Sequence, residues 1–325
     1  MNDGLYAGID LGGTKILVLV ADSRGSVLSA ARIPTLATQG PDAVISRVVD
    51  AVHAAAADAK IETTQLLGAG VSAPGPIDTA AGVLTDPPNL PGWHNVPLAG
   101  ILRERLGIPV VLENDANCGA VGEHMFGAGR GYRHMVFVTI STGIGGGIII
   151  DNELYEGASG AAGEVGHIGV SVDGPVCGAG HIGCLEAFAS GTAIAARARE
   201  MIADGGLPRT ARIAEHDPPL SAKSVQMAAE QGEAEAAAII ASAGRYLGMG
   251  LASLINVFNP QAIVLGGGLT NLGDVILGPA VETARTRSFA QSFVDVRIVE
   301  GELGERVAAL GAIAVARKRI ALSAA

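Results

Sequence analysis

The sequence is poor in aromatic residues, in basic residues and in cysteine. Aromatic residues make up 3% of the 325 residues, so the core has to be built mainly from Ala, Val, Ile and Leu. The 22 Lys and Arg residues are outnumbered by 32 Asp and Glu residues, which gives a formal net charge of −10. Because binding to a phosphate backbone requires clustered positive charge, we expect no nucleic-acid partner.

Three cysteines are an odd and small number, which fits a reducing cytoplasm better than a disulfide framework. The start, MNDGLYAGIDLGG, has an early acid and no basic segment before a long apolar run, so we expect no secretory signal. Residues 246–273 carry no charge and are long enough to span a bilayer, but Asn259-Pro260 and three glycines interrupt them. This pattern favours a buried helix, turn, strand and loop, and a soluble protein with no membrane partner.

One pattern recurs along the chain, namely a short β-branched run followed by a glycine-rich turn. It occurs in residues 6–22, in residues 135–151 and, in shorter form, in residues 262–270. The first two stretches continue into a second apolar run that ends in Asp, so each predicts a β-hairpin. Two such hairpins about 130 residues apart predict two similar lobes that arose from a duplicated unit.

Helical patterns lie between and after these hairpins. Apolar residues recur at helical spacing in residues 41–60, 97–107, 184–204, 224–258 and 305–322, and residues 114–129 form a further candidate helix with Asn114 or Asp115 near its cap. Strands that alternate with helices predict an α/β protein. No linker marks a boundary, so we place one by motif near Asp115.

Glycine-rich turns between strands can direct backbone N–H groups at phosphate oxygens, because an anion can approach a residue that has no Cβ. Three such turns favour a nucleotide ligand over ordinary hairpins. In the first, DLGGTK, Asp10 offers a carboxylate to a metal or its water, Thr14 a hydroxyl and Lys15 a cation. The P-loop pattern is absent, and GAGHIG at residues 178–183 is a weak dinucleotide match because Asp-Gly-Pro separates it from the preceding strand candidate.

Seven motifs, in order, carry a family resemblance: DLGGTK, VSAPGPID, ENDAN, STGIGGGI, GEVGHIGV, GCLEAFASG and VLGGG. Together they resemble the ROK family (repressor, open reading frame, kinase) of sugar kinases, and most closely its bacterial glucokinases. The resemblance covers nearly the whole chain. It implies a two-lobed actin-like, ribonuclease H-like fold with duplicated lobes and a cleft between them, which binds ATP and a hexose. The implied lobes are residues 1–115, completed by a C-terminal helix 305–325, and residues 116–304.

The resemblance implies that ENDAN supplies the catalytic base, Asp115, with Asn114 beside it on the sugar. A hexose hydroxyl is a poor nucleophile unless a carboxylate accepts its proton, a contribution of about 10²- to 10⁴-fold. A helix N-cap is the alternative role for Asp115. Asn89 in PPNLPGW is implied as a sugar contact, and Gly75 in VSAPGPID as a point where the backbone approaches the sugar or forms a plain turn.

GEVGH and GCLE resemble the sugar-binding segment of the family, which implies that Glu164, His167 and Glu186 contact ring hydroxyls. Solvated surface carboxylates are the alternative. ATP and Mg²⁺ are the implied cofactors, because phosphoryl transfer requires positioning and charge neutralisation. The residues expected to contact the nucleotide are Asp10, Gly12, Gly13, Thr14, Lys15, Thr142, Gly143, Gly145, Gly266, Gly267 and Gly268.

The family places a zinc ion near the same segment, held by a histidine and three cysteines. His167, Cys177 and Cys184 match three of these positions, but the position of the middle cysteine is Ala179. A structural zinc ion has four protein ligands in almost all cases. We therefore expect either that His181, Asp173 or water completes the site, or that the metal is weakly bound or absent.

The resulting hypothesis is an ATP-dependent hexose kinase, with glucose as acceptor and glucose 6-phosphate as product. Alternatives within the family are a kinase for N-acetylmannosamine, mannose or fructose, and a polyphosphate-using glucokinase. A non-enzymatic sugar-sensing regulator is disfavoured because DLGGTK begins at Asp10, which leaves no room for an N-terminal DNA-binding domain, and because ENDAN is intact. The resemblance also implies a homodimer or homotetramer.

Overall fold

The computed structural model describes residues 4–323. Residues 1–3, with which the stretch read for a secretory signal begins, and residues 324–325 lie outside this range. The chain divides into two compact units. Unit 1 comprises Met1–Tyr132, Gly147–Ala162 and Gly301–Ala325, and unit 2 comprises Arg133–Gly146 and Gly163–Glu300.

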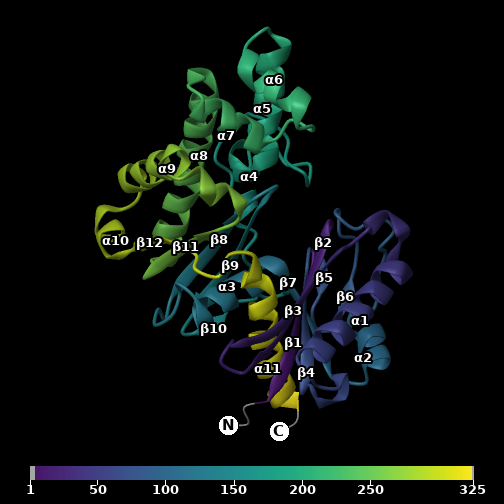
Figure 1. Ribbon diagram of the computed structural model, residues 1–325. Helices are drawn as coiled ribbons and strands as arrows, with labels where there is room; N and C mark the ends of the chain where they lie inside the picture. Colours follow the sequence, from purple (N-terminus) through teal and green to yellow (C-terminus); the bar gives the residue numbers. More distant parts are fainter. Residues whose placement is uncertain (1–3, 324–325) are drawn as a thin grey trace. The chain divides into compact units, whose positions relative to one another are not determined.

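Two five-stranded sheets form the framework, and Figure 1 labels their strands. The strands of the first sheet are β1 (Leu5–Leu11), β2 (Lys15–Asp22), β3 (Val27–Pro34), β4 (Gly68–Ala73) and β7 (Val110–Asn114). Those of the second are β8 (Met135–Ile140), β9 (Ile144–Ile150), β10 (Glu153–Leu154), β11 (Ala262–Gly266) and β12 (Arg297–Glu300). The short strands β5 (Ile77–Asp78) and β6 (Val83–Leu84) pair with each other.

The two sheets have the same topology. Their strand orders are β3-β2-β1-β4-β7 and β10-β9-β8-β11-β12. In each sheet the first three strands along the chain lie side by side in reverse order, and the remaining two strands follow beside the first one. In both sheets the last two neighbour pairs are parallel, as in β1–β4 and β4–β7, and in β8–β11 and β11–β12. This repetition confirms the duplicated α/β unit that the two predicted hairpins indicated.

Apolar spacing predicted most of the helices, but no helix was predicted for residues 208–216, 274–287 or 290–295. The helices are α1 (Pro41–Asp58), α2 (Leu98–Leu106), α3 (Asp115–Phe126), α4 (Leu185–Ala189), α5 (Gly191–Ala203), α6 (Pro208–His216), α7 (Ala222–Glu230), α8 (Ala234–Phe258), α9 (Asp274–Arg287), α10 (Ala290–Asp295) and α11 (Val307–Ser323). Short 3₁₀ segments are η1 (Ala37–Gln39), η2 (Thr63–Gln65), η3 (Val165–His167), η4 (Gly268–Leu272) and η5 (Gly304–Arg306). The predicted stop of α2 is Gly107, whose φ of 69° is the left-handed conformation that favours glycine.

The first sheet buries both of its faces. Side chains that alternate along the strands, such as Ile9 and Val18, pack on one face against α1 and α2. The side chains at the intervening positions of the same strands, such as Tyr6 and Leu19, pack on the other face against α11. Because successive side chains of a strand point to opposite faces, this double burial explains why β1 and β2 read as continuous apolar runs.

Helix α11, drawn in yellow in Figure 1, runs along β1 and β4 of the first sheet. The approach is close because the sheet presents glycine where the helix crosses it. A Cβ added at Gly8 would overlap the carbonyl of Ala309, and one at Gly70 would overlap the carbonyl of Ala312. The C-terminal segment is therefore an integral part of unit 1, and it also contacts β7, which ends at Asn114, directly before the predicted catalytic Asp115.

The division into units differs from the boundary placed by motif at Asp115. Helix α3 groups with unit 1 because it packs on α11, where a Cβ at Gly122 would lie 2.5 Å from the carbonyl oxygen of Val307. The end of β9 also groups with unit 1, because a Cβ at Gly147 would lie 2.6 Å from the Cβ of Ala120 in α3. The lobe boundary at Asp115 stays a prediction.

The uncharged stretch 246–273 folds as the sequence indicated. It comprises the end of α8, the left-handed Asn259, β11 and η4. Among the described residues α8 alone is long and apolar enough to cross a membrane, and 61% of its most apolar window is buried inside the protein. Such burial is typical of the core helix of a soluble protein.

Candidate functional site

Three parallel strands of unit 1 end beside one another, and they carry the acidic residues that the sequence singled out. In the register of the sheet, Asp10 of β1 lies opposite Ser72 of β4, and Ala73 of β4 lies opposite Asn114 of β7. Asp115 follows Asn114 as the first residue of α3. Because parallel strands end at the same edge of a sheet, Asp10 and Asp115 lie at one edge of unit 1.

The carboxyl groups of Asp10 and Asp115 are close enough to interact electrostatically. The pKa of Asp10 is raised from 3.8 to about 6, first by burial and then by the negative charge of Asp115. The positive charge of Lys15 and a hydrogen bond from the hydroxyl of Ser72, at 3.5 Å, act in the opposite direction. Burial and the neighbouring Asp115 thus make ionisation of Asp10 costly, as is expected where a carboxyl group is placed to bind a divalent cation or to take part in proton transfer.

Helix α3 begins with a side-chain cap, and the cap is Asn114. The Oδ1 atom of Asn114 accepts the backbone N–H groups of Ala116 and Asn117, at 2.9 and 3.2 Å. The Oδ1 atom of Asp115 also accepts the N–H group of Ala116, at 2.8 Å. The sequence left the cap open between the two residues, and the structure assigns it to Asn114.

The predicted phosphate turn of unit 1 lies between β1 and β2. The N–H group of Gly12 donates to the carbonyl of Lys15 at 3.0 Å, which closes the turn tightly. The hydroxyl of the fully buried Thr35 donates to the carbonyl of Gly12 at 2.6 Å, and the N–H group of Thr35 donates to the carbonyl of Thr14 at 2.9 Å. The motif search missed Thr35, because a single buried threonine at the end of a strand has no sequence signature.

Lys15, which was expected to offer a cation to phosphate, forms an ion pair instead in this structure. Its Nζ atom lies 3.2 Å from a carboxylate oxygen of Glu305, which also pairs with Arg32 at 3.2 Å. Both partners of the Lys15 pair are partly exposed, so the pair is weak enough to exchange for a stronger anion. The nucleotide role of Lys15 stays a prediction.

Two further predicted sugar contacts lie near these residues of unit 1. A Cβ added at Gly13 would lie 2.7 Å from the carbonyl oxygen of Asn89, so the phosphate turn and the Asn89 segment are in contact. A Cβ added at Gly75 would lie 3.5 Å from the amide nitrogen of Asn114. Unit 1 thus brings Gly75 to Asn114 and Asn89 to the phosphate turn, as a shared ligand site requires.

The corresponding turn of unit 2 joins β8 to β9 through Ser141, Thr142 and Gly143. The start of α5 anchors it: the N–H group of Gly191 donates to the carbonyl of Ser141 at 2.8 Å, and the hydroxyl of Thr192 donates to the carbonyl of Thr142 at 2.8 Å. The predicted contact Gly145 is the second residue of β9. The anchoring by Thr192 was not anticipated from the sequence.

The third glycine-rich turn follows β11 and lies against the second. A Cβ at Gly267 would overlap the carbonyl of Ile140, the last residue of β8, and the φ of Gly267 is 89°. Gly266 ends β11, and around Gly268 no atom lies within 4 Å of an added Cβ. Glycine at position 267 is therefore required by close packing and by backbone conformation, and the two predicted nucleotide turns of unit 2 are neighbours.

Glu186, predicted as a sugar contact, supports the β8–β9 turn. Its Oε2 atom accepts the N–H group of Ile144 at 3.1 Å and lies 2.5 Å from the position of a Cβ added at Gly143. A Cβ at Gly178 would lie 3.6 Å from the other carboxylate oxygen. Glu186 therefore connects the turn with the loop that carries the cysteines, a contact that does not depend on sugar.

His167 and Glu164, the other predicted sugar contacts of unit 2, lie at the η3 segment. The Nε2 atom of His167 is 4.0 Å from a carboxylate oxygen of Glu164. The Nδ1 atom of His167 is 3.6 Å from the sulfur of Cys177. The two ring nitrogens of His167 thus face different partners, a carboxylate on one side and a thiol on the other.

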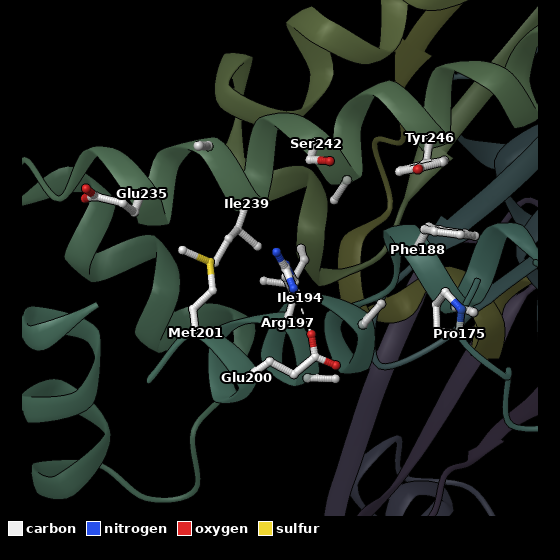
Figure 2. Close-up of a pocket in the computed structure, with 15 residues that line it drawn as sticks. Pro175, Phe188, Ile194, Arg197, Glu200, Met201, Glu235, Ile239, Ser242 and Tyr246 are labelled. Atoms are coloured by element: carbon white, nitrogen blue, oxygen red, sulfur yellow. Dashed lines mark hydrogen bonds and ion pairs between the residues drawn. The ribbon is translucent and has the colours of Figure 1, made fainter. Parts of the chain in front are cut away.

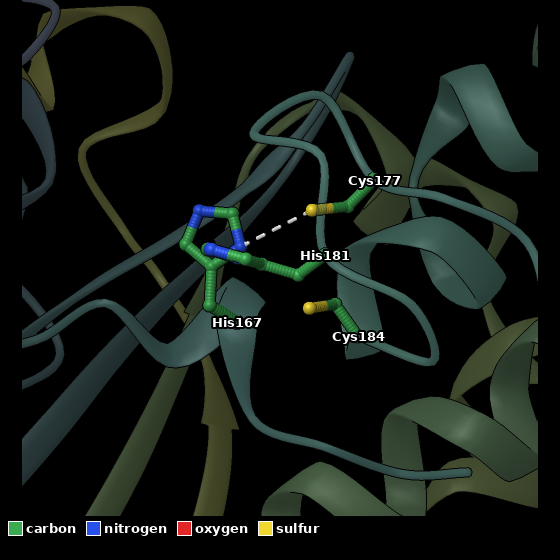
Figure 3. Close-up of side chains that lie close together, drawn as sticks. All are labelled: His167, Cys177, His181 and Cys184. Atoms are coloured by element: carbon green, nitrogen blue, oxygen red, sulfur yellow. Dashed lines mark hydrogen bonds between the residues drawn. The ribbon is translucent and has the colours of Figure 1, made fainter. Parts of the chain in front are cut away.

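A second histidine completes a group of four potential metal ligands. One ligand atom from each of His167, Cys177, His181 and Cys184 lies within 4.8 Å of all the others. Figure 3 shows the four side chains directed toward one another, and the two imidazole rings are perpendicular with centroids 5.4 Å apart. Of the alternatives left open for the fourth position, the structure supplies His181. The GAGHIG stretch is the loop between Cys177 and Cys184, and it carries His181.

The donor types of these four residues, and the distance between two of their ligand atoms, agree with a zinc site. With bonds of about 2.3 Å to sulfur and about 2.0 Å to nitrogen, two ligands of a tetrahedral zinc ion lie roughly 3.3 to 3.8 Å apart. The distance between the sulfur of Cys177 and Nδ1 of His167 is 3.6 Å. Two thiolates and two neutral imidazoles also make a donor set typical of structural zinc.

The third cysteine belongs to the core. Cys118 is fully buried, and burial raises the pKa of its thiol well above the usual value. A Cβ added at Gly311 of α11 would overlap the carbonyl of Cys118, so this part of α3 packs closely against α11. Cys118 is therefore a packed residue of the core, and its buried thiol is a poor nucleophile.

A further cavity, of about 630 Å³, lies in unit 2 (Figure 2). It is bounded by α5 and α8, and Phe188 and Tyr246 stack at one end with centroids 4.1 Å apart. Arg197 and Glu200 form an ion pair at 2.9 Å within it. None of the residues that the sequence singled out lines this cavity.

Comparisons with known proteins agree with these motifs. A model described as the ROK family matches residues 6–319. A glucokinase from Streptomyces coelicolor is 35% identical over 97% of this chain and 98% of its own length. A xylose repressor from Caldicellulosiruptor bescii is 32% identical over 96% of this chain and 78% of its own length. The crystal structure of a ROK family glucokinase from Streptomyces griseus in complex with glucose and AMPPNP has a TM-score of 0.82, with 34% identity and coverage of 97% and 100%.

Proposed function

The chain belongs to the ROK family, and we propose that it is an ATP-dependent hexose kinase that converts glucose to glucose 6-phosphate. Its likeness to ROK glucokinases extends over nearly the whole chain and includes a relative crystallised with glucose and a nucleotide analogue. The observation within this molecule that carries the proposal is the placement of Asp10 and Asp115 at one edge of a sheet, beside a tight glycine-threonine turn.

Asp115 acts as the general base in this proposal. Its carboxylate accepts the proton of the attacking sugar hydroxyl, which makes the oxygen a better nucleophile. Asn114, Asn89 and Gly75 hold the sugar in unit 1. The proximity of Gly75 to Asn114 and of Asn89 to the β1–β2 turn supports this assignment, since one predicted sugar residue then lies next to the neighbour of the base and the other next to the predicted phosphate turn.

The glycine-rich turns bind the phosphates of ATP. Backbone N–H groups at Gly13 and Thr14 in unit 1, and at Thr142 and Gly143 in unit 2, are the proposed donors. Gly12, whose own N–H group closes the first turn, lets the phosphates approach the backbone, and Gly145, Gly266, Gly267 and Gly268 lie on the nucleotide side in this proposal. Asp10, which is ionised near neutral pH, is the residue proposed to hold Mg²⁺ or its water. When bound, Mg²⁺ supplies positive charge that neutralises the phosphates during transfer.

Glu164, His167 and Glu186 are the proposed sugar contacts of unit 2. Carboxylate and imidazole groups can each pair with a ring hydroxyl, and they are left unpaired by a sugar that lacks the hydroxyl in that position. We propose that His167 also binds zinc through Nδ1, together with Cys177, His181 and Cys184. The metal would then fix the orientation of the ring, so that Nε2 is available to the sugar.

A sugar-responsive regulator is the second candidate, and the likeness to xylose repressors favours it. A kinase for mannose, fructose or N-acetylmannosamine, or one that uses polyphosphate, would share the proposed chemistry and differ in the acceptor or donor. We further propose that the protein is cytoplasmic, as its three free cysteines suggest, and that it forms a homodimer or homotetramer.

The proposal is tested by measuring release of ADP with glucose, mannose, fructose and N-acetylmannosamine as acceptors, and product formation with polyphosphate in place of ATP. Glucose with ATP is expected to give the highest kcat/KM. The Asp115→Asn variant is expected to lose about 10²- to 10⁴-fold in kcat while it retains glucose binding, because the amide cannot accept the proton.

Asp42→Asn is the matched control, since Asp42 is an exposed acid in the first turn of helix α1, as Asp115 is in the first turn of α3. It should leave kcat unchanged. Full activity of Asp115→Asn would exclude the proposed base. Sugar binding by the wild-type protein without any phosphoryl transfer would favour the regulator.

A further inference from the structure

The strand that leads to the proposed base contains a buried acid. Glu113 is the fourth residue of β7, directly before Asn114, and only 1% of its side chain is exposed. A buried carboxylate is costly unless several donors satisfy it. The proposed sugar and phosphate contacts do not include Glu113, so its burial calls for another explanation.

Three donors converge on the carboxylate of Glu113. Its Oε1 atom accepts the backbone N–H group of Asn114 at 2.8 Å and the side-chain amide of Asn117 at 3.0 Å. Its Oε2 atom accepts a guanidinium N–H group of Arg319. Asn114 and Asn117 flank Asp115 in the sequence, so one carboxylate holds the chain on both sides of the proposed base.

Arg319 reaches this strand from the C-terminal helix. Besides Glu113 it donates to the carbonyl of Leu112 at 3.1 Å and to a carboxylate oxygen of Glu156 at 2.6 Å. The planar guanidinium group can bind several acceptors in one fixed geometry, which an ammonium group cannot do. The backbone of β7 just before the base is thereby tied to α11, almost at the end of the described chain.

We propose that Glu113 and Arg319 are positioning residues for the phosphoryl-transfer site, and that they act by fixing Asn114 and Asn117 on either side of Asp115. This inference rests on the proposed role of Asp115. Asn114 also caps α3 through its own side chain, so a shift of its backbone would move the first turn of the helix and the carboxylate of Asp115 with it. A displacement of about 1 Å can lower a rate about 10²-fold.

The test is the Arg319→Gln variant in the full-length protein. Glutamine keeps a helix-forming side chain but removes the positive charge and the forked donor geometry. We expect kcat for the phosphorylation of glucose to fall about 10- to 100-fold, with KM for glucose within about twofold of the wild type, because the sugar still binds while the base is misplaced. Arg319→Lys, which keeps the charge but not the forked donor geometry, should recover kcat only in part and stay about three- to tenfold below the wild type.

Two variants separate positioning from a general loss of stability. Arg317→Gln removes an arginine of the same helix, whose guanidinium group donates to the carbonyl of Ser23 at 2.5 Å. Glu156→Gln removes the other carboxylate partner of Arg319, which is partly exposed. Both should keep the kcat of the wild type, even where the melting temperature falls as much as in Arg319→Gln.

A measurement without substrate distinguishes failure of this inference from failure of the proposed function. Hydrogen exchange of the backbone amides at positions 114, 116 and 117 should speed up about tenfold or more in Arg319→Gln and stay unchanged in Arg317→Gln. If the wild type phosphorylates no hexose, the kinase assignment fails, and the exchange rates still decide whether Arg319 orders this segment.

Positioning is overturned if exchange at these amides is the same in Arg319→Gln and Arg317→Gln. It is also overturned if an active wild type and Arg319→Gln share the same kcat. Should Arg319→Gln fail to fold, the folded Arg319→Lys variant is compared with Arg317→Gln by the same two measurements, and equal values again exclude the role.

Discussion

The β1–β2 turn of unit 1 and the β8–β9 turn of unit 2 each span three residues and contain both threonine and glycine, but they are supported differently. The first is closed by its own backbone and by the neutral hydroxyl of Thr35. The second rests on a carboxylate, Glu186, whose helix α4 begins directly after Cys184. Similar motifs in a duplicated fold can therefore depend on different parts of the chain.

The β8–β9 turn is therefore connected to the proposed metal loop through Glu186, whereas the supports of the β1–β2 turn lie elsewhere. Cys184 is the N-cap residue of α4, so a change in the geometry of the loop is transmitted within two residues to Glu186. The supports of the first turn lie in β1, β2 and the segment after β3. Four experiments exploit this contrast.

Removal of the proposed zinc ion should have the largest effect. A chelator, or the Cys184→Ser variant, is expected to lower the stability of residues 164–186 and of the β8–β9 turn by about 5 kcal/mol or more, since structural zinc contributes on this scale. Hydrogen exchange should therefore accelerate at residues 141–144 and stay unchanged at residues 12–15. Metal analysis of the purified protein should give one zinc ion per chain, and equal acceleration at both turns would contradict the contrast.

The titration of Asp10 should give the next largest effect, on unit 1 alone. Because the pKa of Asp10 is about 6 in the folded state and 3.8 ordinarily, the folded state binds this proton more tightly. Stability is therefore lost as the pH rises from about 4 to about 6, by roughly 3 kcal/mol at 1.36 kcal/mol per pH unit. The free energy of unfolding is measured with urea in the absence of magnesium. The Asp10→Asn variant should not lose stability over this pH range, and its free energy of unfolding should exceed that of the wild type most above pH 7.

If the difference in free energy of unfolding between Asp10→Asn and the wild type is the same at pH 4 and at pH 8, the pKa of Asp10 is not raised by burial and by Asp115. Asp22→Asn serves as the control of opposite sign. Backbone hydrogen bonds hold the pKa of Asp22 below its usual value, so its stabilising contribution is present above the ordinary pKa and is lost as the pH falls.

Neutralising the carboxylate beside each turn compares the two supports directly. Glu186→Gln should lower kcat/KM about 10- to 100-fold, because a charge-assisted hydrogen bond to the turn is replaced by a neutral one. Glu305→Gln removes the exposed partner of Lys15 at the first turn and should change kcat/KM less than about twofold, as expected of a surface ion pair. Steady-state kinetics measure both variants. If Glu186→Gln and Glu305→Gln lower kcat/KM by the same factor, the two turns do not differ in their dependence on the neighbouring carboxylate.

The smallest expected effect concerns the neutral support of the first turn. Thr35→Val keeps the shape of the side chain but leaves the carbonyl of Gly12 without its buried hydroxyl donor, at a cost of about 1 to 2 kcal/mol. Thr286→Val removes an exposed hydroxyl that donates to a helix carbonyl, and should cost less than about 0.5 kcal/mol. Urea unfolding of both variants measures the difference.

Much of the fold could be predicted because its determinants are local. The apolar spacing of residues 41–60 predicted α1, which ends at Asp58, and Gly107 predicted the end of α2. The two hairpin patterns predicted the duplication that the identical strand orders confirm. Periodicity and turn residues act within a few positions of each other, so a single sequence reveals them.

The candidate site could be predicted only as far as its motifs extend. ENDAN and DLGGTK pointed to Asp115 and Asp10, but their proximity follows from the parallel register of β1, β4 and β7. Glu113 stood inside a quoted motif without a role, although an acid at the end of an otherwise apolar strand is a signal of a buried polar contact. Its partner Arg319 lies 206 positions away, where no local pattern indicates the pairing.

The order of residues alone determined the family, the α/β class, the duplicated hairpins and the missing cysteine at Ala179, because each is encoded in local composition and spacing. Only the tertiary structure decided that His181 lies beside His167, Cys177 and Cys184, that Glu186 supports the β8–β9 turn, and that the C-terminal helix holds the strand before Asp115. These contacts depend on where separate segments meet once the core has packed, and the free energy of that packing belongs to the whole fold rather than to any segment.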